Sequence, residues 1–250
     1  MKIISLNVWG GRVHAELTHF LKSKQDSIDI FCFQEMYHQA DGKFSNVEWK
    51  DDGIHNQLFD YVAQLLPNHV GIFYPHFEDF WGLAMFVKKN IQIIAEGEKL
   101  VHQTESIEEA RRGGTSKNIQ YVLTEINSKK VSIVNFHGLW NGKGKTDSES
   151  RVAQSRKIVE FLKSLEGEVV LCGDFNLRPD TESLKIVEDF GFRNLVKEYG
   201  ITSTRTSHYK KEERFADYAL ITKGVEVKDF KILPEEVSDH NAMYLEFSLS

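Results

Sequence analysis

Two short stretches of the sequence are apolar at every position, and they limit the folds that are open to the chain. They are IFCF at 30–33 and VVLC at 169–172. A strand of this kind is covered on both of its faces. Several other strand-like runs alternate apolar and polar residues, which is typical of half-exposed antiparallel strands. The sequence therefore predicts sheets in which some strands are buried on both sides and others face solvent.

The runs that predict strands and helices are spread along the whole chain. Strands are expected over 2–8, 29–34, 70–75, 82–89, 91–97, 119–126, 130–137, 168–174, 216–222, 225–233 and 242–249. Amphipathic spacing predicts helices over 12–24, 55–66, 147–165 and 181–190, and the third begins at a capping-box pattern, TDSE at 146–149. No repeat and no linker rich in Gly, Pro or Ser divides the chain. One α/β domain over 1–250, with two mixed sheets and helices outside, is the simplest architecture.

Composition agrees with a globular protein that needs no covalent crosslinks. The chain has 250 residues, of which 41% are hydrophobic and 27% charged, and this length buries enough surface for a stable core. Its two cysteines, Cys32 and Cys172, lie inside apolar runs, so we expect reduced core thiols, with a disulfide as the minor alternative. No apolar stretch is long enough to span a bilayer, and a signal-peptide pattern is missing. We therefore expect a cytoplasmic protein that acts as a monomer.

The net charge of −6 limits the partners that the surface can attract. A broadly acidic chain is poorly suited to indiscriminate binding of nucleic acid. A small substrate that contains phosphate, or a local basic rim around one site, is compatible with this charge. So is a compact acidic site that holds a divalent cation.

Polar side chains of a particular kind stand at the ends of the predicted strands. The set consists of Asn7, Glu35, His137, Asp174 and Asn176 at or after strand ends, and Asp217, Asp239 and His240 near strand starts. Each alone has an ordinary explanation, and the Asp174 and Asn176 pair could simply shape a turn. Because strand ends of parallel and mixed sheets share an edge, the set can converge there. Carboxylate and amide oxygens suit Mg²⁺ or Ca²⁺ better than zinc, and the two histidines titrate near neutral pH.

Six stretches around these residues resemble the motifs of the endonuclease/exonuclease/phosphatase superfamily, which has the deoxyribonuclease I-like fold. They are SLNVWG (5–10), FQEM (33–36), VNFHGLW (134–140), GDFNLRPD (173–180), FADYALI (215–221) and SDHNAMYLEF (238–247). They occur in the order of the family and span nearly the whole chain. The resemblance implies a four-layered α/β sandwich of two facing mixed β-sheets flanked by helices, with an active site at one edge.

The resemblance also implies a metal centre and a reaction. Members of the family hydrolyse phosphate esters with a divalent metal, so Glu35, with help from Asn7 and Asp239, would form the Mg²⁺-binding set. Mn²⁺ or Ca²⁺ would be the alternative ions. The metal and nearby donors would offset the negative charge that keeps nucleophiles away from a phosphate ester.

Further roles follow for the catalytic positions of the motifs. Asp174 and Asn176 would orient the attacking water and contact the scissile phosphate. His240, paired with Asp217, would stabilise the phosphate or act as a general acid–base group. His137 would hold another non-bridging oxygen or protonate the leaving group. A protein that had kept the fold and lost catalysis would lack some of these side chains, and none is missing.

The substrate is less constrained than the reaction. Abasic-site endonucleases of the exonuclease III type carry aspartate and tyrosine where this chain has Trp9 and His137. Histidine at position 137 resembles the pattern of deoxyribonuclease I, sphingomyelinases, inositol-polyphosphate phosphatases and tyrosyl-DNA phosphodiesterases, which have histidine at this place in the motif. We expect a phosphodiesterase that acts on a nucleic acid or nucleotide-like substrate. The alternative is a phosphatase or phospholipase of the inositol-phosphate or sphingomyelin type. Arg111 and Arg112 are candidates for a phosphate clamp or for a solvated loop.

Overall fold

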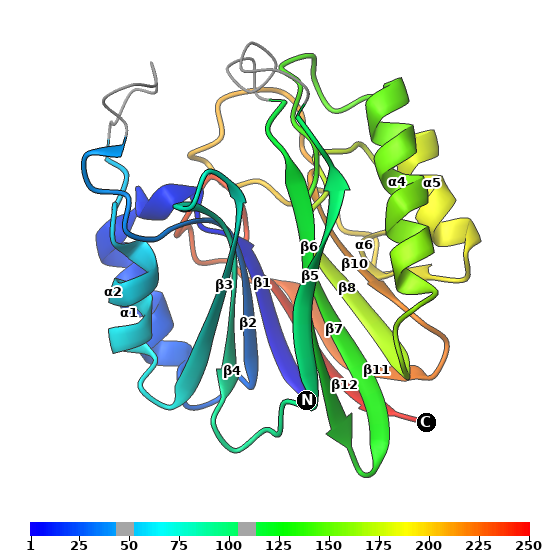
Figure 1. Ribbon diagram of the computed structural model, residues 1–250, viewed down its shortest axis with the longest axis horizontal. Coiled ribbons are helices and arrows are strands. Elements are labelled where there is room, and N and C mark those ends of the chain that lie inside the picture. The colour runs from blue at the N-terminus through cyan, green and yellow to red at the C-terminus, as the bar shows by residue number, and fades with distance from the viewer. Residues whose placement is uncertain (44–52, 105–113) are drawn as a thin grey trace.

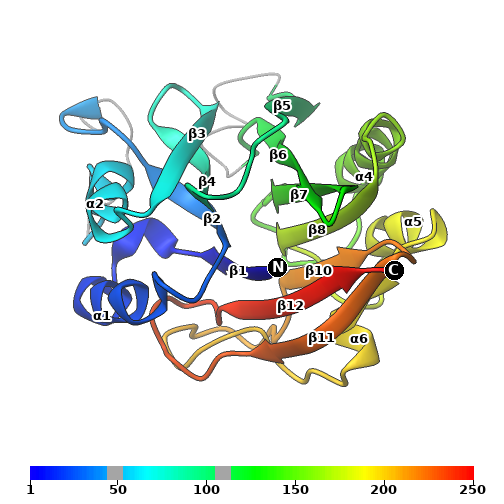
Figure 2. The ribbon, with the colours of Figure 1, turned by 90° about the horizontal axis from the view of Figure 1, so that it is seen from below.

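Two six-stranded sheets face each other in the computed structural model, which describes residues 1–43, 53–104 and 114–250 (Figures 1 and 2). The first sheet has the order β11 (Val225–Ile232), β12 (Met243–Leu249), β1 (Lys2–Asn7), β2 (Ile30–Tyr37), β4 (Trp81–Lys88), β3 (His69–Phe77). The second has the order β5 (Ala95–His102), β6 (Lys117–Ile126), β7 (Lys129–His137), β8 (Glu168–Asp174), β10 (Asp217–Ile221), β9 (Arg193–Asn194). The candidate residues Arg111 and Arg112 lie outside the described residues.

Each sheet contains one parallel pair of strands, β1 with β2 and β7 with β8, and is otherwise antiparallel. The two continuously apolar runs lie on β2 and β8, and residues 30–33 and 169–172 are all buried. Successive side chains of a strand point to opposite faces, so their burial confirms that both faces of these strands are covered. A parallel pair needs a crossover connection, and helices provide it in both sheets.

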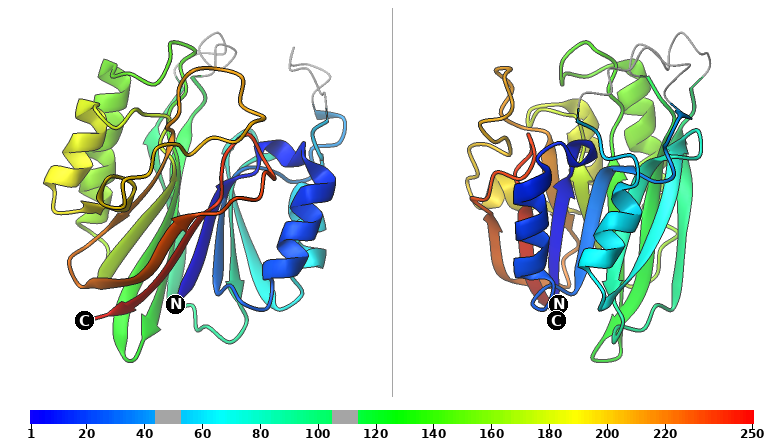
Figure 3. Two further views of the ribbon diagram at one scale, coloured as in Figure 1. Left: turned by 180° about the vertical axis from the view of Figure 1, so that it is seen from behind. Right: turned by 90° about the vertical axis from the view of Figure 1, so that its left-hand side faces the viewer.

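Helices cover the outer face of each sheet (Figures 2 and 3). The first sheet is covered by α1 (His14–Lys24) and α2 (Leu58–Leu65), and the second by α4 (Glu149–Leu162) and α5 (Glu182–Asp189). A 3-10 turn, η1 (Trp9–Gly11), follows β1, and a single-turn helix, α6 (Leu195–Glu198), follows β9. This is the four-layered α/β sandwich that the motifs implied. No helix among the described residues is long and apolar enough to cross a membrane.

A layer of buried amides joins the two sheets just below one end of the sandwich. Gln34 on β2 donates from Nε2 to Asn135 Oδ1 on β7 at 2.7 Å. Asn135 in turn donates from Nδ2 to Gln120 Oε1 on β6 at 3.2 Å and to the Phe33 carbonyl at 2.9 Å. Because buried amides are costly without partners, this network fixes how the sheets sit against each other. It lies directly beneath the strand ends that carry the candidate site residues.

Some of the observed elements differ from the predicted ones. The strand expected over 91–97 is displaced to β5 (Ala95–His102), because the apolar residues at 91 and 93 pack against the core outside the strand. The short elements β9 and α6 carry too few residues for a periodic signal, and they were not predicted. The helix expected from 147 begins at Glu149 with Ser148 as its N-cap, which accepts from the Arg151 N–H. Asp147 instead accepts from the backbone N–H groups of Glu182 and Ser183 at the start of α5.

The two cysteines agree with the prediction of reduced core thiols. Cys32 and Cys172 are both free and buried. Cys172 lies against the Val134 carbonyl at 3.6 Å, within the core between the sheets. Burial raises the pKa of the Cys32 thiol well above its usual range, so this thiol stays protonated and unreactive.

Candidate active site

The polar residues singled out in the sequence meet at one end of the sandwich. Strands β1 and β7 run towards this end, and the N- and C-termini lie at the opposite one (Figures 1 and 3). Asn7, His137 and Asp174 are the last residues of β1, β7 and β8, and Asp217 is the first residue of β10. A cavity of about 320 Å³ opens there. Six of the eight predicted site residues line it: Glu35, His137, Asp174, Asn176, Asp239 and His240. The other two, Asn7 and Asp217, hydrogen-bond to lining residues from behind.

Asp174 uses its two carboxylate oxygens for different purposes. Oδ1 accepts from the Asn176 backbone N–H at 2.8 Å, which closes the local turn. Oδ2 accepts from Asn7 Nδ2 at 3.1 Å and lies 3.5 Å from His240 Nε2. Burial works to raise the pKa of Asp174, but the positive charges of His240 and Lys145 outweigh it and hold the pKa below its ordinary value. The turn and the site are therefore two functions of one carboxylate, which stays ionised.

Asn176 follows the end of β8 in a left-handed conformation, with φ of 53°. Asparagine tolerates this conformation better than most residues. Its Oδ1 accepts from the buried ammonium of Lys145 at 2.8 Å, and its Nδ2 donates to the Gly138 carbonyl at 3.2 Å. The amide is thus oriented by two partners before any ligand arrives.

A bulge in β2 turns Glu35 towards the cavity. The pairing of β2 with β4 shifts between Phe33 and Met36, and Glu35 has a positive φ of 56°. Strained backbone of this kind is frequent at functional sites. The carboxylate accepts from Asn7 Nδ2 at 3.1 Å and remains about 26% exposed. Burial and the nearby negative charge of Asp239 raise the pKa of Glu35.

The Asn7 amide is oriented by the backbone that follows it. Its Oδ1 accepts from the Trp9 N–H at 2.9 Å, so its NH₂ group faces the carboxylates of Glu35 and Asp174. In this orientation Asn7 positions the two acids rather than offering them an oxygen. Its predicted role as a metal ligand would require the amide to turn.

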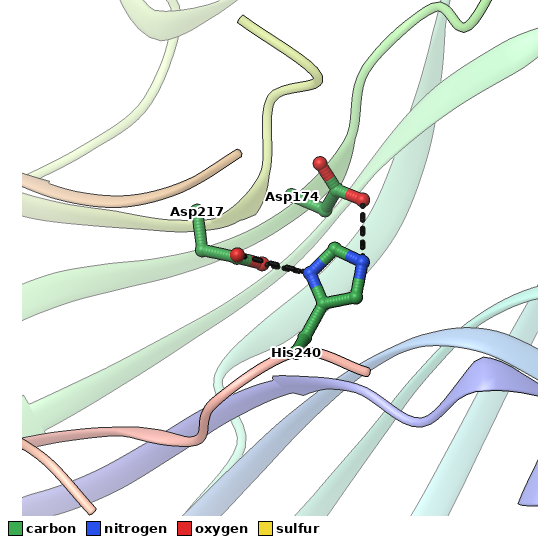
Figure 4. A group of neighbouring side chains, drawn as sticks. All are labelled: Asp174, Asp217 and His240. Carbon is green, nitrogen blue, oxygen red and sulfur yellow. Dashed lines mark hydrogen bonds and ion pairs between the residues drawn. The ribbon is translucent and has the colours of Figure 1, made fainter. Parts of the chain in front are cut away.

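His240 and Asp217 form a buried pair beside Asp174 (Figure 4). The Nδ1–H of His240 donates to both carboxylate oxygens of Asp217, at 2.8 and 2.9 Å, which leaves Nε2 directed towards Asp174. Burial works to lower the pKa of His240, but the Asp217 carboxylate more than compensates and raises it. The pair therefore favours an imidazolium whose Nε2–H points into the cavity.

His137 lies in a different electrostatic environment from His240. Its Nε2 is 3.8 Å from Asp174 Oδ2 and 3.9 Å from Glu35 Oε1, and its Nδ1 has no partner among the described residues. Burial first, and then the positive charge of Lys117, lower the pKa of His137 well below its usual range. One histidine of the site is thus neutral and the other favours the charged form, which separates their chemical roles.

The carboxylates fit the expected divalent cation. Glu35 and Asp239 both line the cavity, where burial and then the negative charge of Asp239 raise the pKa of Glu35, and a bound cation would offset that charge. A second group, Asp174, Asp217 and His240, offers ligand atoms within 4.8 Å of one another. Oxygen-rich donors of this kind suit Mg²⁺, Mn²⁺ or Ca²⁺.

Several cavity residues were not predicted from the sequence. They are Thr115, Lys117, Lys145, Arg205, Tyr209 and Lys211. Lys117 and Lys145 are only 1% and 2% exposed, although lysine in polar sequence normally signals a solvated surface. Trp140, which follows His137 in the motif at 134–140, also lines the cavity. Arg178, in the motif at 173–180, is about half exposed and pairs with Asp180.

Comparison with known proteins extends the likeness beyond the short motifs. The Endonuclease/Exonuclease/phosphatase family matches the chain over residues 4–240, whereas no curated protein matches the sequence. A solved structure of a family protein from Bacteroides thetaiotaomicron is 15% identical, with a TM-score of 0.76, and the alignment covers 100% of this chain and 98% of that one. A mannosyl-6-phosphatase from the same organism is 14% identical, with a TM-score of 0.72 and 100% of both chains covered.

A third structure, of D. rerio TDP2 complexed with a single-strand DNA product, is 16% identical, with a TM-score of 0.71. It covers 99% of this chain, and 98% of its own length is covered. These structures share the fold, and the family match covers all but a few residues at each end. The chain belongs to the endonuclease/exonuclease/phosphatase family of phosphate-ester hydrolases.

Proposed function

We propose that this chain is a divalent-metal-dependent phosphoesterase that hydrolyses a phosphodiester bond in a nucleic acid or nucleotide-like substrate. The observation that carries the proposal is the arrangement around Asp174. One ionised carboxylate lies close to an imidazolium and a neutral imidazole, and two further acids, Glu35 and Asp239, line the same cavity. Phosphoester hydrolysis requires this combination of a proton acceptor, hydrogen-bond donors and a cation.

The metal would be held by Glu35 and Asp239, with Asn7 fixing the position of Glu35 through its NH₂ group. When bound, a divalent cation polarises the phosphoryl group and neutralises charge on the departing oxygen. We propose Mg²⁺, with Mn²⁺ or Ca²⁺ as alternatives. Arg205 donates to Asp239 Oδ2 at 3.0 Å and so holds the second acid in place.

The side chains of the protein supply the remaining steps. Asp174, oriented by Asn7 and by the Asn176 N–H, accepts the proton of the attacking water. His240, fixed by Asp217, donates from Nε2 to a phosphoryl oxygen. His137 is neutral, so it donates a hydrogen bond from Nε2–H to a second non-bridging oxygen and keeps its proton. The proton for the leaving group then comes from the His240 imidazolium, not from His137. Each donor is placed before the substrate binds, so little reorganisation is needed during the reaction.

Aromatic rings paired with cations around the cavity support a nucleotide-like substrate. The Arg205 guanidinium lies 4.0 Å from the centre of the Tyr209 ring, and Lys211 Nζ lies 5.0 Å from the Trp140 ring. Such pairs offer a stacking surface for a base together with positive charge for a phosphate. The alternative, a phosphatase or phospholipase of the inositol-phosphate or sphingomyelin type, draws support from the fold shared with a mannosyl-6-phosphatase. Action as a monomeric, single-domain enzyme in the cytoplasm stays a prediction of the sequence.

Hydrolysis of bis(p-nitrophenyl) phosphate in the presence of Mg²⁺ tests the proposed reaction. Asp174→Ala removes the proton acceptor, so its kcat/KM is expected to fall by about a hundredfold or more. Asp189→Ala is the matched control, because Asp189 is an exposed carboxylate at the end of α5 that forms an ion pair with Lys185. Absence of hydrolysis by the unmodified protein with Mg²⁺, Mn²⁺ and Ca²⁺ would refute the reaction.

A substrate panel separates the two classes of function. It contains single- and double-stranded DNA, RNA, abasic DNA, 5′-tyrosyl DNA, inositol phosphates and sphingomyelin. Turnover of a nucleic acid supports the proposed substrate class. Turnover confined to inositol phosphates or sphingomyelin would overturn that class and favour the alternative.

A further inference from the structure

The cavity extends past His137 to two side chains that the proposed reaction does not use, Lys117 and Thr115. Both belong to the start of β6 or to the residues just before it. Lys117 is 1% exposed and Thr115 is 2% exposed, yet both line the cavity. Polar groups this deeply buried normally have partners within the protein.

The Lys117 ammonium has no carboxylate partner among the described residues. Its Nζ lies 3.5 Å from His76 Nε2 and 4.5 Å from the centre of the Trp81 ring. Burial lowers the pKa of Lys117 to about 8, although the more distant charges of Glu35 and Asp174 oppose that change. The arrangement holds a positive charge in a nearly dry place, where an arriving anion would complete it.

The Thr115 hydroxyl is also without a partner in the described part of the chain. The residues on either side of it are anchored, because Thr104 donates from its N–H to Ser116 Oγ at 3.0 Å and from its hydroxyl to the Gly114 carbonyl at 2.8 Å. Thr115 is therefore held in place by its neighbours while its own hydroxyl is unused. A hydroxyl and an ammonium together are donors suited to phosphate oxygens.

This pair of donors lies one strand away from the reacting centre. Lys117 is on β6, which pairs with β7, and neighbouring strands are about 4.8 Å apart. The His76 and Trp81 rings, which contact Lys117, have their centres 5.5 and 5.8 Å from the His137 ring. Lys145, in contrast, bonds to Asn176 on the opposite side of Asp174. Lys145 is therefore the lysine placed to offset the charge of a phosphoryl group between Asp174 and His240. Lys117 is placed to bind a different anionic group.

We propose that Lys117 and Thr115 form a subsite for a second phosphate group, so that the preferred substrate carries one close to the phosphoester that is hydrolysed. The inference rests on the proposed function, which it makes more specific. A phosphate fits the subsite better than an uncharged group, because the buried Lys117 ammonium contacts the His76 and Trp81 rings and no carboxylate of the described residues, and a nearby negative charge would stabilise it further.

Isothermal titration at saturating free Mg²⁺ tests the subsite without requiring turnover. The probes are inorganic phosphate, methylenediphosphonate and propane-1,3-diyl bisphosphate, the last two of which differ in the separation of their phosphorus atoms. We expect the better of the two double anions to bind about tenfold more tightly than phosphate. Lys117→Met should remove that advantage and Thr115→Val should reduce it by about threefold, while binding of phosphate changes little.

Lys99→Met is the matched control, because Lys99 is an exposed lysine on the neighbouring strand β5. This variant removes the same charge from the same sheet, and the double anion should still bind more tightly than phosphate. Equal weakening of all three probes by Lys117→Met would assign Lys117 to the reacting phosphate and overturn the subsite. The subsite would also be overturned if the double anion still bound more tightly than phosphate to Lys117→Met. Loss of that tighter binding in Lys99→Met would overturn it as well. If Lys117→Met selectively loses the tighter binding of the double anion but the unmodified protein hydrolyses no phosphate ester, the subsite stands and the proposed function is refuted.

Discussion

Among single residues, Lys117 and Lys145 are the clearest cases in which the site lowers the stability of the folded protein. Each ammonium is almost completely buried, and the pKa of each is lowered to about 8, chiefly by burial. Lys145 has a neutral partner in Asn176 Oδ1, whereas Lys117 faces an imidazole and an aromatic ring. A fold selected for stability alone would place an apolar side chain at either position.

Lys117→Met is therefore expected to stabilise the folded protein at pH 7, by about 1–3 kcal/mol. The pKa of Lys117 in the folded chain lies below its ordinary value of 10.5. Wild-type stability consequently rises as pH increases from about 8 towards 10.5, and the advantage of the variant shrinks over the same window. Denaturant unfolding of both proteins at pH 7 and pH 10 measures it. Equal stability at pH 7 would show that the buried charge carries no penalty.

At the scale of elements, the parallel pair β7–β8 delivers His137 and Asp174 side by side through an unusually close approach of backbone. The register pairs His137 with Asp174. Gly173 has a φ of 144°, and a Cβ placed on it would lie 2.0 Å from the Phe136 carbonyl oxygen. Only glycine allows the chain to pass at this distance. The spacing between the His137 and Asp174 side chains thus depends on the absence of a side chain at Gly173.

Gly173→Ala should destabilise the protein by about 3 kcal/mol, because the new methyl group overlaps a backbone oxygen in the middle of a sheet. Gly191→Ala is the comparison, since Gly191 also has a positive φ, 112°, but nothing within 4 Å of its Cβ position. Its cost should be limited to backbone strain, about 1 kcal/mol. Urea unfolding of the two variants measures the difference, and similar losses would show that the close approach is unimportant.

The elements also show which parts of the molecule the sequence could reveal. Continuous apolar runs identified β2 and β8, because a strand that is buried on both faces has an apolar side chain at successive positions. The family motifs brought together the eight polar residues, since each motif includes its strand and its side chain. The capping-box pattern at 146–149 marked the start of α4, but it did not reveal that Asp147 within it binds the start of another helix, α5. Lys117 gave no signal, because its burial depends on packing by His76 and Trp81 from strands distant in the sequence.

At the scale of the whole molecule, the acids of the site should link metal binding to global stability. Ions that bind only the folded chain stabilise it by mass action, by about 2.7 kcal/mol at a hundred times Kd. Saturating Mg²⁺ is therefore expected to raise Tm by several degrees. Glu35→Gln and Asp239→Asn should each reduce that increase, and Asp189→Asn should not. An equal increase in all four proteins, measured by calorimetry, would place the bound ion elsewhere.

The site also draws on both ends of the chain. β1, which ends in Asn7, pairs with β12, which follows His240, and the register joins Lys2 to Glu246. On a ribosome the first of these strands emerges long before the second, so the first sheet stays open during most of synthesis. A nascent chain, or one cut before His240, therefore lacks both part of the candidate site and the strand that pairs with β1. The proposed hydrolytic activity is then expected only after translation has passed the last motif.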